Sequence, residues 1–193
     1  EIKQKLKEIK RKFPNREARI AKYIDGPLFT NNNIVAKDTV LLGNINYQIT
    51  GLLPFTDNPF TTIGNDWELP RKILNKKQLA RYKKIATDVG NRLRDSGWKG
   101  LFGIDVVMEE RTGKLYLLEI NCRQPASTTY ESILQNTKHK QQNTTYTLTN
   151  LHTYKLITTF EAHLLSLLDR SLKNHQLIPL SSGAQIIQRV TKD

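Results

Sequence analysis

Residues 101–123, LFGIDVVMEERTGKLYLLEINCR, constrain the fold more than any other stretch because they carry the pattern of a β-hairpin. Two apolar segments that contain β-branched residues flank the turn-prone EERTGK, where Gly113 can adopt a positive φ angle. If the hairpin closes around residues 111–113, Asp105 on the first strand is expected to lie opposite Glu119 on the second.

The polar residues of this hairpin fall on one face, because side chains on a strand alternate between faces. Asp105 and Glu119, about 5 Å apart at an effective dielectric near 20, would repel each other by roughly 3 kcal/mol. A cation or a shared proton removes that cost. Oxygen ligands from Asp105, Glu119 and Asn121 suit Mg²⁺ or Mn²⁺. Arg123 could then bind a phosphate or carboxylate with two hydrogen bonds. The spacing alone also fits a solvated strand face without a metal ion. The flanking residues are therefore needed to choose between these two interpretations.

Those flanking residues resemble the metal-binding signature of the ATP-grasp ligases. The superfamily includes D-alanine–D-alanine ligase, biotin carboxylase, carbamoyl-phosphate synthetase and the purine-pathway glycinamide ligases. Its signature is an Asp in one strand, a short turn, and a second strand ending apolar–Glu–apolar–Asn–x–Arg. A second segment, IAKYIDGPLFT at residues 20–30, is similar to the hinge strand of the same superfamily. The two segments occur in the family's order.

The resemblance implies a site for ATP and Mg²⁺ (or Mn²⁺). It implies that Asp105, Glu119 and Asn121 bind the metal ion. It also implies that Arg123 is catalytic and faces the transferred phosphate or the acyl-phosphate intermediate.

The hinge segment carries the implied nucleotide contacts. By resemblance, the backbone of Tyr23 and Ile24 would meet the adenine edge, Lys22 would lie beside the nucleotide, and Leu118 would form the floor under the base. One hinge position departs from the family, because Ala21 stands where relatives often have Glu.

The fold class expected from the resemblance is α+β: the C-terminal lobe of an ATP-grasp fold, a mainly antiparallel sheet flanked by helices. Residues 1–193 would be the C-terminal part of an ATP-grasp domain. Within it, residues 1–14 would be a helix from the preceding lobe and residues 136–150 a polar surface insert.

The implied enzyme is a ligase, most simply of the C–N type. It would activate a small carboxylate as an acyl phosphate for attack by an amine or another nucleophile. The expected partners are ATP, the carboxylate, and the missing N-terminal grasp half, either in cis or as a separate chain. A homo-oligomer stays open.

Three alternatives stay open beside this enzyme. The chain could be a degenerate lobe that binds or scaffolds without turnover, as Ala21 and Leu28 hint, because both stand where relatives often have an acidic residue. It could be one chain of a split enzyme, since no Gly-rich phosphate loop precedes residue 20 in the printed sequence. The third alternative is a basic nucleic-acid-binding module.

Net charge and cysteine content limit which ligands and partners are expected. The formal net charge of +12 is concentrated in residues 1–22 (+6) and 71–99 (+8), which favours anionic ligands. The sequence shows no nucleic-acid-binding motif and little aromatic interleaving in these basic segments, so nucleic acid is the weakest of the partner hypotheses.

No apolar run is long enough for a membrane span, so no membrane contact is expected. The sole cysteine, Cys122, excludes an intramolecular disulfide, fits a reducing cytoplasm, and is expected to be a small buried hydrophobe. The sequence opens at Glu1 with no initiator Met, and we expect a processed or truncated chain.

Periodicity gives the remaining elements. Strands are expected near residues 17–24, 27–36 and 39–51, followed by a long irregular loop over residues 51–70. Helices are expected over residues 75–95, where the apolar stripe is clearest, and over about 153–172 with Leu156, Phe160, Leu164 and Leu168 directed inward.

Overall fold

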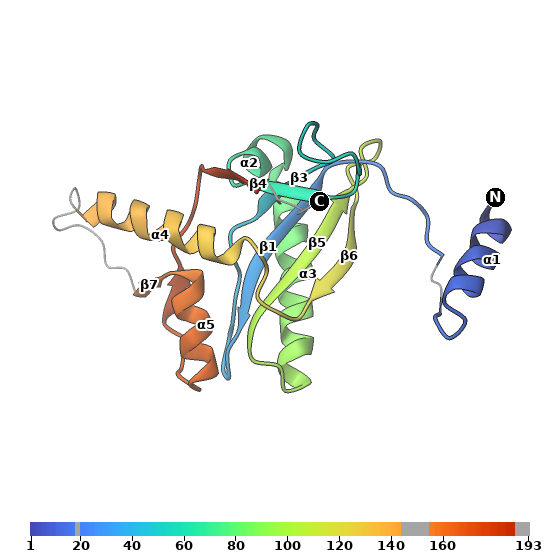
Figure 1. Ribbon diagram of the computed structural model, residues 1–193. Coiled ribbons are helices and arrows are strands. Elements are labelled where there is room, and N and C mark those ends of the chain that lie inside the picture. Colours follow the sequence, from blue (N-terminus) through green and yellow to red (C-terminus); the bar gives the residue numbers. More distant parts are fainter. Residues whose placement is uncertain (18–19, 144–154, 188–193) are drawn as a thin grey trace, which may run out of the picture.

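The computed structural model describes residues 1–17, 20–143 and 155–187 (Figure 1). The elements are, in chain order, α1 (Ile2–Lys12), β1 (Leu28–Val35), β2 (Val40–Leu41), β3 (Asn46–Thr50), β4 (Thr62–Asp66), α2 (Leu69–Ile73), α3 (Lys76–Asp95), β5 (Gly100–Met108), β6 (Leu115–Asn121), α4 (Thr128–Asn143), β7 (Lys155–Ile157), α5 (Thr159–Leu167), β8 (His175–Leu177) and β9 (Ala184–Ile186). None of the described helices is both long and apolar enough to cross a membrane.

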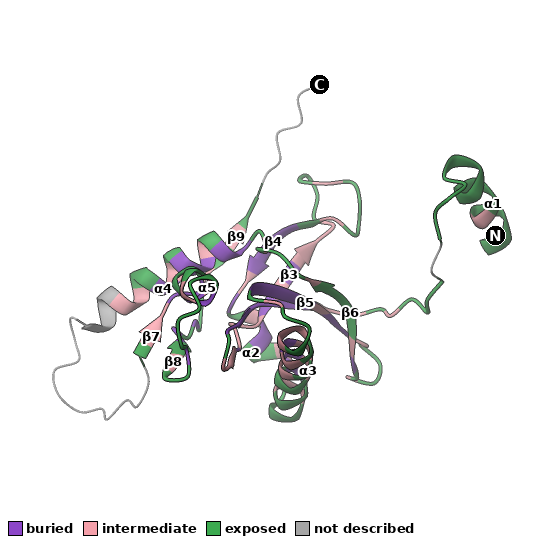
Figure 2. Cartoon of the chain, turned by 90° about the horizontal axis from the view of Figure 1, so that it is seen from below, coloured by how far each residue is buried: buried purple, intermediate pink, exposed green. Residues whose placement is uncertain are grey.

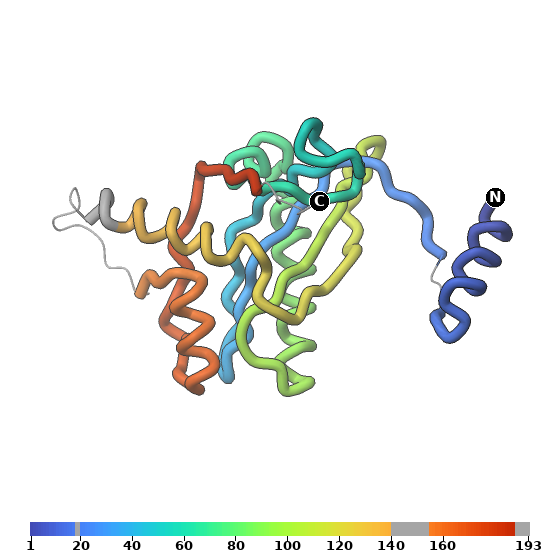
Figure 3. The backbone as a smooth tube through the Cα atoms, in the orientation of Figure 1, coloured from blue at the N-terminus to red at the C-terminus, as the bar shows by residue number. Residues whose placement is uncertain are grey.

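The main sheet has seven strands, in the order β6-β5-β1-β3-β4-β9, with β2 paired to β1. All of its strand pairs are antiparallel. A separate two-stranded parallel sheet joins β7 and β8. Helices lie on both sides of the main sheet, which confirms the α+β class and the mainly antiparallel sheet (Figure 3).

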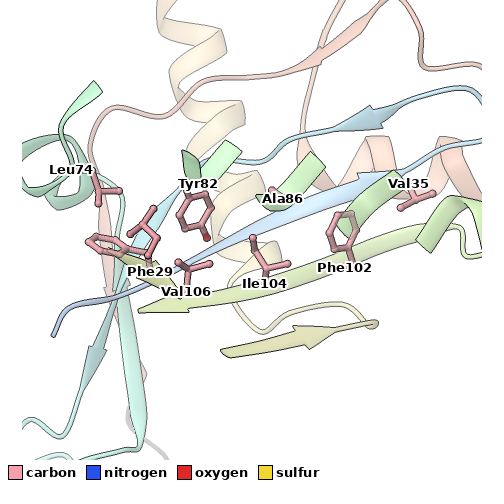
Figure 4. Packing of buried hydrophobic residues seen from close by; sticks show 9 residues of the cluster. Phe29, Val35, Leu74, Tyr82, Ala86, Phe102, Ile104 and Val106 are labelled. Atoms are coloured by element: carbon pink, nitrogen blue, oxygen red, sulfur yellow. The ribbon is translucent and has the colours of Figure 1, made fainter. Parts of the chain in front are cut away.

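One face of β1 and β5 builds the main core. Alternate residues of the two strands point toward α3 and are buried, as Figure 4 shows for Phe29, Phe102 and Ile104 beside Tyr82 and Ala86 of the helix. Burying five such side chains at about 2 kcal/mol each contributes on the order of 10 kcal/mol before conformational entropy is counted. This face therefore fixes where β5 lies in the sheet.

The opposite face of the same two strands changes character along its length. Ile34 and Leu101 are buried in a second apolar cluster with Ala162 of α5. Further along, the positions that share this face are Asn32 and Asp105, which are polar. The face is thus apolar where α5 covers it and polar beyond α5, and the polar part holds the candidate site.

The expected helix over residues 75–95 is confirmed as α3. Asn75 caps it in a capping box with Gln78, each side chain accepting from the other residue's backbone N–H. Gly97, with φ +83°, follows the C-cap, which is the left-handed position that glycine occupies without strain.

Two expectations about strands and loops are wrong or only partly right, and a third is only partly tested. Residues 20–24, expected as a strand, form none. The expected loop over residues 51–70 contains β4, which pairs with β3 on one side and with β9 on the other. Residues 136–143 of the expected polar surface insert are the last part of α4, and 144–150 lie outside the described residues, so the insert itself stays a prediction.

The expected helix near residues 153–172 is shorter and turned the other way. α5 begins after Thr158, which caps it in a capping box with Glu161, and it buries the small residues Thr159, Ala162 and Ser166. Phe160, Leu164 and Leu168 are exposed instead of inward. Figure 2 shows that the neighbouring α4 likewise alternates between buried and exposed residues along its length. Small side chains let α5 lie close against β1 and β5. The apolar stripe therefore predicted the wrong buried face of this helix.

α1 stands apart from the rest of the described chain (Figure 1). It buries none of its residues, although Ile2 and Ile9 are apolar. The segment that follows α1 reaches the sheet at residues 25–27, where the backbone carbonyls of Asp25 and Pro27 accept from the N–H groups of Glu110 and Met108.

Candidate functional site

The β5–β6 hairpin places the two expected carboxylates directly opposite each other. Asp105 of β5 pairs with Glu119 of β6, as the spacing predicts. The register shifts between Asp105 and Val106, so that Leu118 has no partner on β5. A bulge of this kind re-aims side chains locally, and here it keeps Glu119 opposite Asp105 although Val106 pairs with Leu117.

Asp105 is partly buried, and its carboxylate is surrounded by neutral hydrogen-bond donors. Gln48 Nε2 donates to Oδ1 at 2.6 Å, and Asn121 Nδ2 donates to Oδ2 at 3.2 Å. Burial raises the pKa of Asp105, a hydrogen bond from Thr30 opposes the rise, and the nearby Glu119 charge adds to it. The described residues give Asp105 amide and hydroxyl partners but no cation.

Asn121 links the Asp105 carboxylate to Arg123. While its Nδ2 faces Asp105, its Oδ1 accepts from Arg123 Nη2 at 3.0 Å. A second guanidinium contact, from Nη1 to the carbonyl oxygen of Gln124, is long at 3.5 Å. Several donors of Arg123 therefore stay available for an anion.

Cys122, between these two residues, was expected to be buried and is exposed. It follows β6, which ends at Asn121 on the edge of the sheet, and none of the described elements covers it there. The expectation fails because a strand at an edge can leave both of its faces open.

The carboxylate and the guanidinium share one cavity of about 210 Å³. Its walls come from β1, β3, β4, β5 and β6 and from the turn that leads into α4. Sequence reasoning missed most of the polar lining, namely Thr30, Gln48, Thr62, Asn65 and Ser127. The available signal was polar residues at strand positions that share a face, where a buried sheet normally carries apolar ones.

The four residues expected to bind the nucleotide lie outside that cavity's lining. Lys22 Nζ lies 3.1 Å from Glu109 Oε1, just beyond the end of β5. Tyr23 is exposed, and its ring packs edge-on against Phe60 with centroids 6.3 Å apart. Ile24 is half-buried, and Leu118 is half-exposed at the bulge. Their nucleotide contacts stay predictions.

The donor set fits a hard divalent cation. No group of three or more His, Cys, Asp or Glu side chains gathers in the described chain, so a metal held by protein ligands alone is not built there. Two carboxylates and an amide, from Asp105, Glu119 and Asn121, match a Mg²⁺ ion that also keeps water or phosphate ligands.

A second carboxylate, which no sequence pattern predicted, is buried close to the cavity. Glu131 of α4 is fully buried and accepts from Asn32 Nδ2 and, at 3.1 Å, from Asn44 Nδ2. Asn32 Nδ2 also lies 3.1 Å from Ser127 Oγ, which lines the cavity. Burial raises the pKa of Glu131 to about 7, although the two asparagine hydrogen bonds oppose the rise.

The arrangement of the strands and helices matches solved ligase structures. Carboxyaminoimidazole ribonucleotide synthase from Aspergillus clavatus complexed with ATP superposes with a TM-score of 0.50 at 16% identity. Glycinamide-RNase-transformylase T from Mycobacterium tuberculosis superposes with a TM-score of 0.52 at 16% identity. The fold is that of the ATP-grasp ligases. This confirms the resemblance at the level of fold.

The match covers most of this chain but a minor part of each ligase. The superposition takes in 83% of this chain and 33% of the A. clavatus enzyme, and 86% of this chain and 41% of the M. tuberculosis enzyme. No family model and no curated protein matches the sequence. The ATP-grasp fold of this lobe therefore rests on three-dimensional similarity.

Proposed function

We propose that this chain is the C-terminal part of an ATP- and Mg²⁺-dependent ligase that activates a small carboxylate as an acyl phosphate. An amine or another nucleophile then displaces phosphate from the acyl group. In this proposal the chain supplies the metal-binding and nucleotide-binding half-site, and α1 belongs to the preceding lobe. The N-terminal half of the grasp comes from the same polypeptide or from a second chain.

One observation carries the proposal: the pairing of Asp105 with Glu119 across β5 and β6 in a sheet with the ATP-grasp fold. Two carboxylates on opposite positions of a strand pair are costly without a cation. Asn121 and Arg123 follow at the end of β6, in the same cavity as Asp105. Asp105, Asn121 and Arg123 thus line one cavity, while the exposed Glu119 faces Asp105 from the paired strand position without lining that cavity.

Each residue has a defined task in this proposal. Asp105, Glu119 and Asn121 hold Mg²⁺ (or Mn²⁺), which neutralises phosphate charge when it is bound. Arg123 orients the transferred phosphoryl group and stabilises negative charge that develops on its oxygens. Lys22, Tyr23, Ile24 and Leu118 position the nucleotide. No nucleophilic side chain is required, because the substrate carboxylate attacks the γ-phosphorus.

Calorimetric titration of Mg²⁺-ADP into the protein tests the proposal. We expect binding that requires both Mg²⁺ and the Asp105 carboxylate, so Asp105→Asn should lose at least about 1.4 kcal/mol of binding free energy, a factor of ten. Asparagine keeps the size of the side chain but loses one of the two acceptor oxygens that Gln48 and Asn121 use. Circular dichroism should therefore confirm that the variant keeps the fold.

Glu110→Gln is the matched control, because it removes an equal charge from the exposed turn of the same hairpin. It should bind Mg²⁺-ADP like the unmodified protein. Binding that ignores Mg²⁺, or that survives in Asp105→Asn at full strength, would contradict the proposed site. Absence of binding in a protein that includes the preceding lobe would favour a degenerate scaffold lobe.

A further inference from the structure

A second cavity lies away from the Asp105 site and shares no lining residue with it. Its volume is about 570 Å³, within the range of small-molecule sites. It opens between the chain around β2, the α2–α3 region and the segment after β8. Most of its wall is apolar, with side chains that include Val40, Leu42, Leu79 and Leu177.

Hydrogen bonds hold two walls of this cavity together. Asn44 Oδ1 accepts from the Leu180 backbone N–H at 2.8 Å, and Asn44 Nδ2 donates to the Ile178 carbonyl oxygen at 3.1 Å. The same amide donates to the buried Glu131. The segment that follows β2 is thereby tied to the segment that follows β8. The cavity is consequently preformed, and a ligand would not have to order its walls.

Two cationic side chains line this cavity. Arg71 Nη2 donates to the Leu180 carbonyl oxygen at 3.1 Å, which orients the guanidinium and leaves its other N–H groups available. Lys83 lines the cavity from α3, one turn after Leu79. Neither Arg71 nor Lys83 forms an ion pair with any residue that the structure describes.

The surroundings add positive charge. Lys138 Nζ donates to Ser181 and Ser182, close enough to Arg71 that the guanidinium, after burial, contributes to lowering the pKa of Lys138. Residues 71–99 carry a net +8 in sequence. An anion that enters this cavity is therefore attracted from several directions.

We propose that this cavity is a binding site for a carboxylate with an apolar body, such as a medium-chain fatty acid. The apolar walls take up the hydrocarbon, and the Arg71 guanidinium pairs with the carboxylate, assisted by Lys83. The planar fork of arginine matches a carboxylate with two parallel hydrogen bonds. A strongly hydrated phosphate gains little from apolar walls. The inference is independent of the ATP-grasp site and of the activity proposed for it.

Octanoate is the probe, and calorimetry with the complete protein measures its affinity. We expect saturable binding that Arg71→Gln weakens about tenfold or more, since the variant loses the charge-assisted pair. Arg81→Gln is the matched control, because Arg81 is an exposed arginine of α3 that does not line the cavity. Octanol, which has the same chain without the charge, should bind more weakly than octanoate.

Leu42→Trp gives an independent check by filling the cavity while leaving both cations in place. It should abolish octanoate binding, and the nuclear magnetic resonance shifts caused by octanoate in the unmodified protein should map to residues 40–45 and 176–180. Failure of octanoate to bind the unmodified protein overturns the proposal. Equal affinity in Arg71→Gln, or shifts confined to other segments, overturns it as well.

Discussion

Gln48 Nε2 donates to Asp105 Oδ1 at 2.6 Å, and Thr62 Oγ1 donates to Gln48 Oε1 at 2.8 Å. These contacts join β3, β4 and β5 through the candidate metal ligand. The amide stabilises the ionised carboxylate, which burial would otherwise disfavour. Without a bound cation, Gln48 supplies part of the positive potential that Asp105 requires.

The first prediction replaces that donor with a third carboxylate. Gln48→Glu should destabilise the metal-free protein by about 2 to 4 kcal/mol, because two partly buried carboxylates then face each other. Added Mg²⁺ should recover much of this loss. Thermal unfolding with and without Mg²⁺ measures both effects, and Gln4→Glu on the exposed helix α1 is the control. A deficit that Mg²⁺ leaves untouched would argue against a cation at Asp105.

The second prediction concerns Arg123, whose hydrogen bonds within the described chain reach only Asn121 and Gln124. Arg123→Lys keeps the charge but loses the bidentate fork, so turnover by the complete ligase should fall about tenfold or more. Mg²⁺-ADP affinity should change much less, since arginine acts on the transferred group. Steady-state kinetics beside calorimetry separate the two effects. A loss in affinity equal to the loss in turnover would assign Arg123 to nucleotide binding instead.

The third prediction follows from the raised pKa of Glu131, about 7 in the folded protein against 4.5 as the reference. Between these two pH values the folded state keeps a proton that the unfolded state has lost. The free energy of unfolding should therefore fall as the pH rises through this window, by up to about 3 kcal/mol. Denaturant unfolding as a function of pH measures it.

Glu131→Gln should flatten that dependence, because glutamine does not titrate. Glu161→Gln on α5 provides a comparison at an exposed carboxylate. An unchanged pH slope in Glu131→Gln would show that other groups cause it.

The fourth prediction tests the packing of α3 on the sheet. A Cβ at Gly90 would lie 2.5 Å from Val40 Cγ1 and 3.0 Å from Phe102 Cζ. Gly90→Ala should therefore destabilise the protein by about 1 to 3 kcal/mol, despite the better helix propensity of alanine. Chemical denaturation gives the difference. If the variant is more stable, α3 does not lie this close to the sheet.

The fifth prediction uses the exposed thiol of Cys122. A maleimide should label Cys122 in the native protein about as fast as in the unfolded protein, since no folded structure shields it. Bound Mg²⁺-ADP should slow labelling, because Asn121 and Arg123 flank the thiol. Mass spectrometry over time measures both rates. Labelling that requires unfolding would place β6 away from the edge of the sheet.

Sequence patterns predicted the elements whose residues interact locally. The helix over residues 75–95 follows from its apolar spacing and its capping residues. The pairing of Asp105 with Glu119 follows from a short turn and strand alternation. Both depend on neighbours within about twenty residues, and a sequence displays such relationships directly.

Other features depend on contacts between distant segments. Phe160 and Leu164 carry a helical apolar stripe, yet α5 turns its small residues toward β1 and β5 because these permit close approach. The strand β4 could not be predicted from its own residues, because it is stabilised by pairing with β3 on one edge and with β9 on the other. The periodicity of apolar residues within one segment does not show which distant segment that segment will pack against.

The sequence by itself determined the hairpin, its two opposed carboxylates, and the Asn121 and Arg123 that follow them. Only the tertiary structure brought Gln48 to Asp105 and buried Glu131 behind the cavity, because both contacts join residues more than fifty positions apart. Alternation along a strand fixes which side chains share a face. What lies above that face depends on how the whole chain packs.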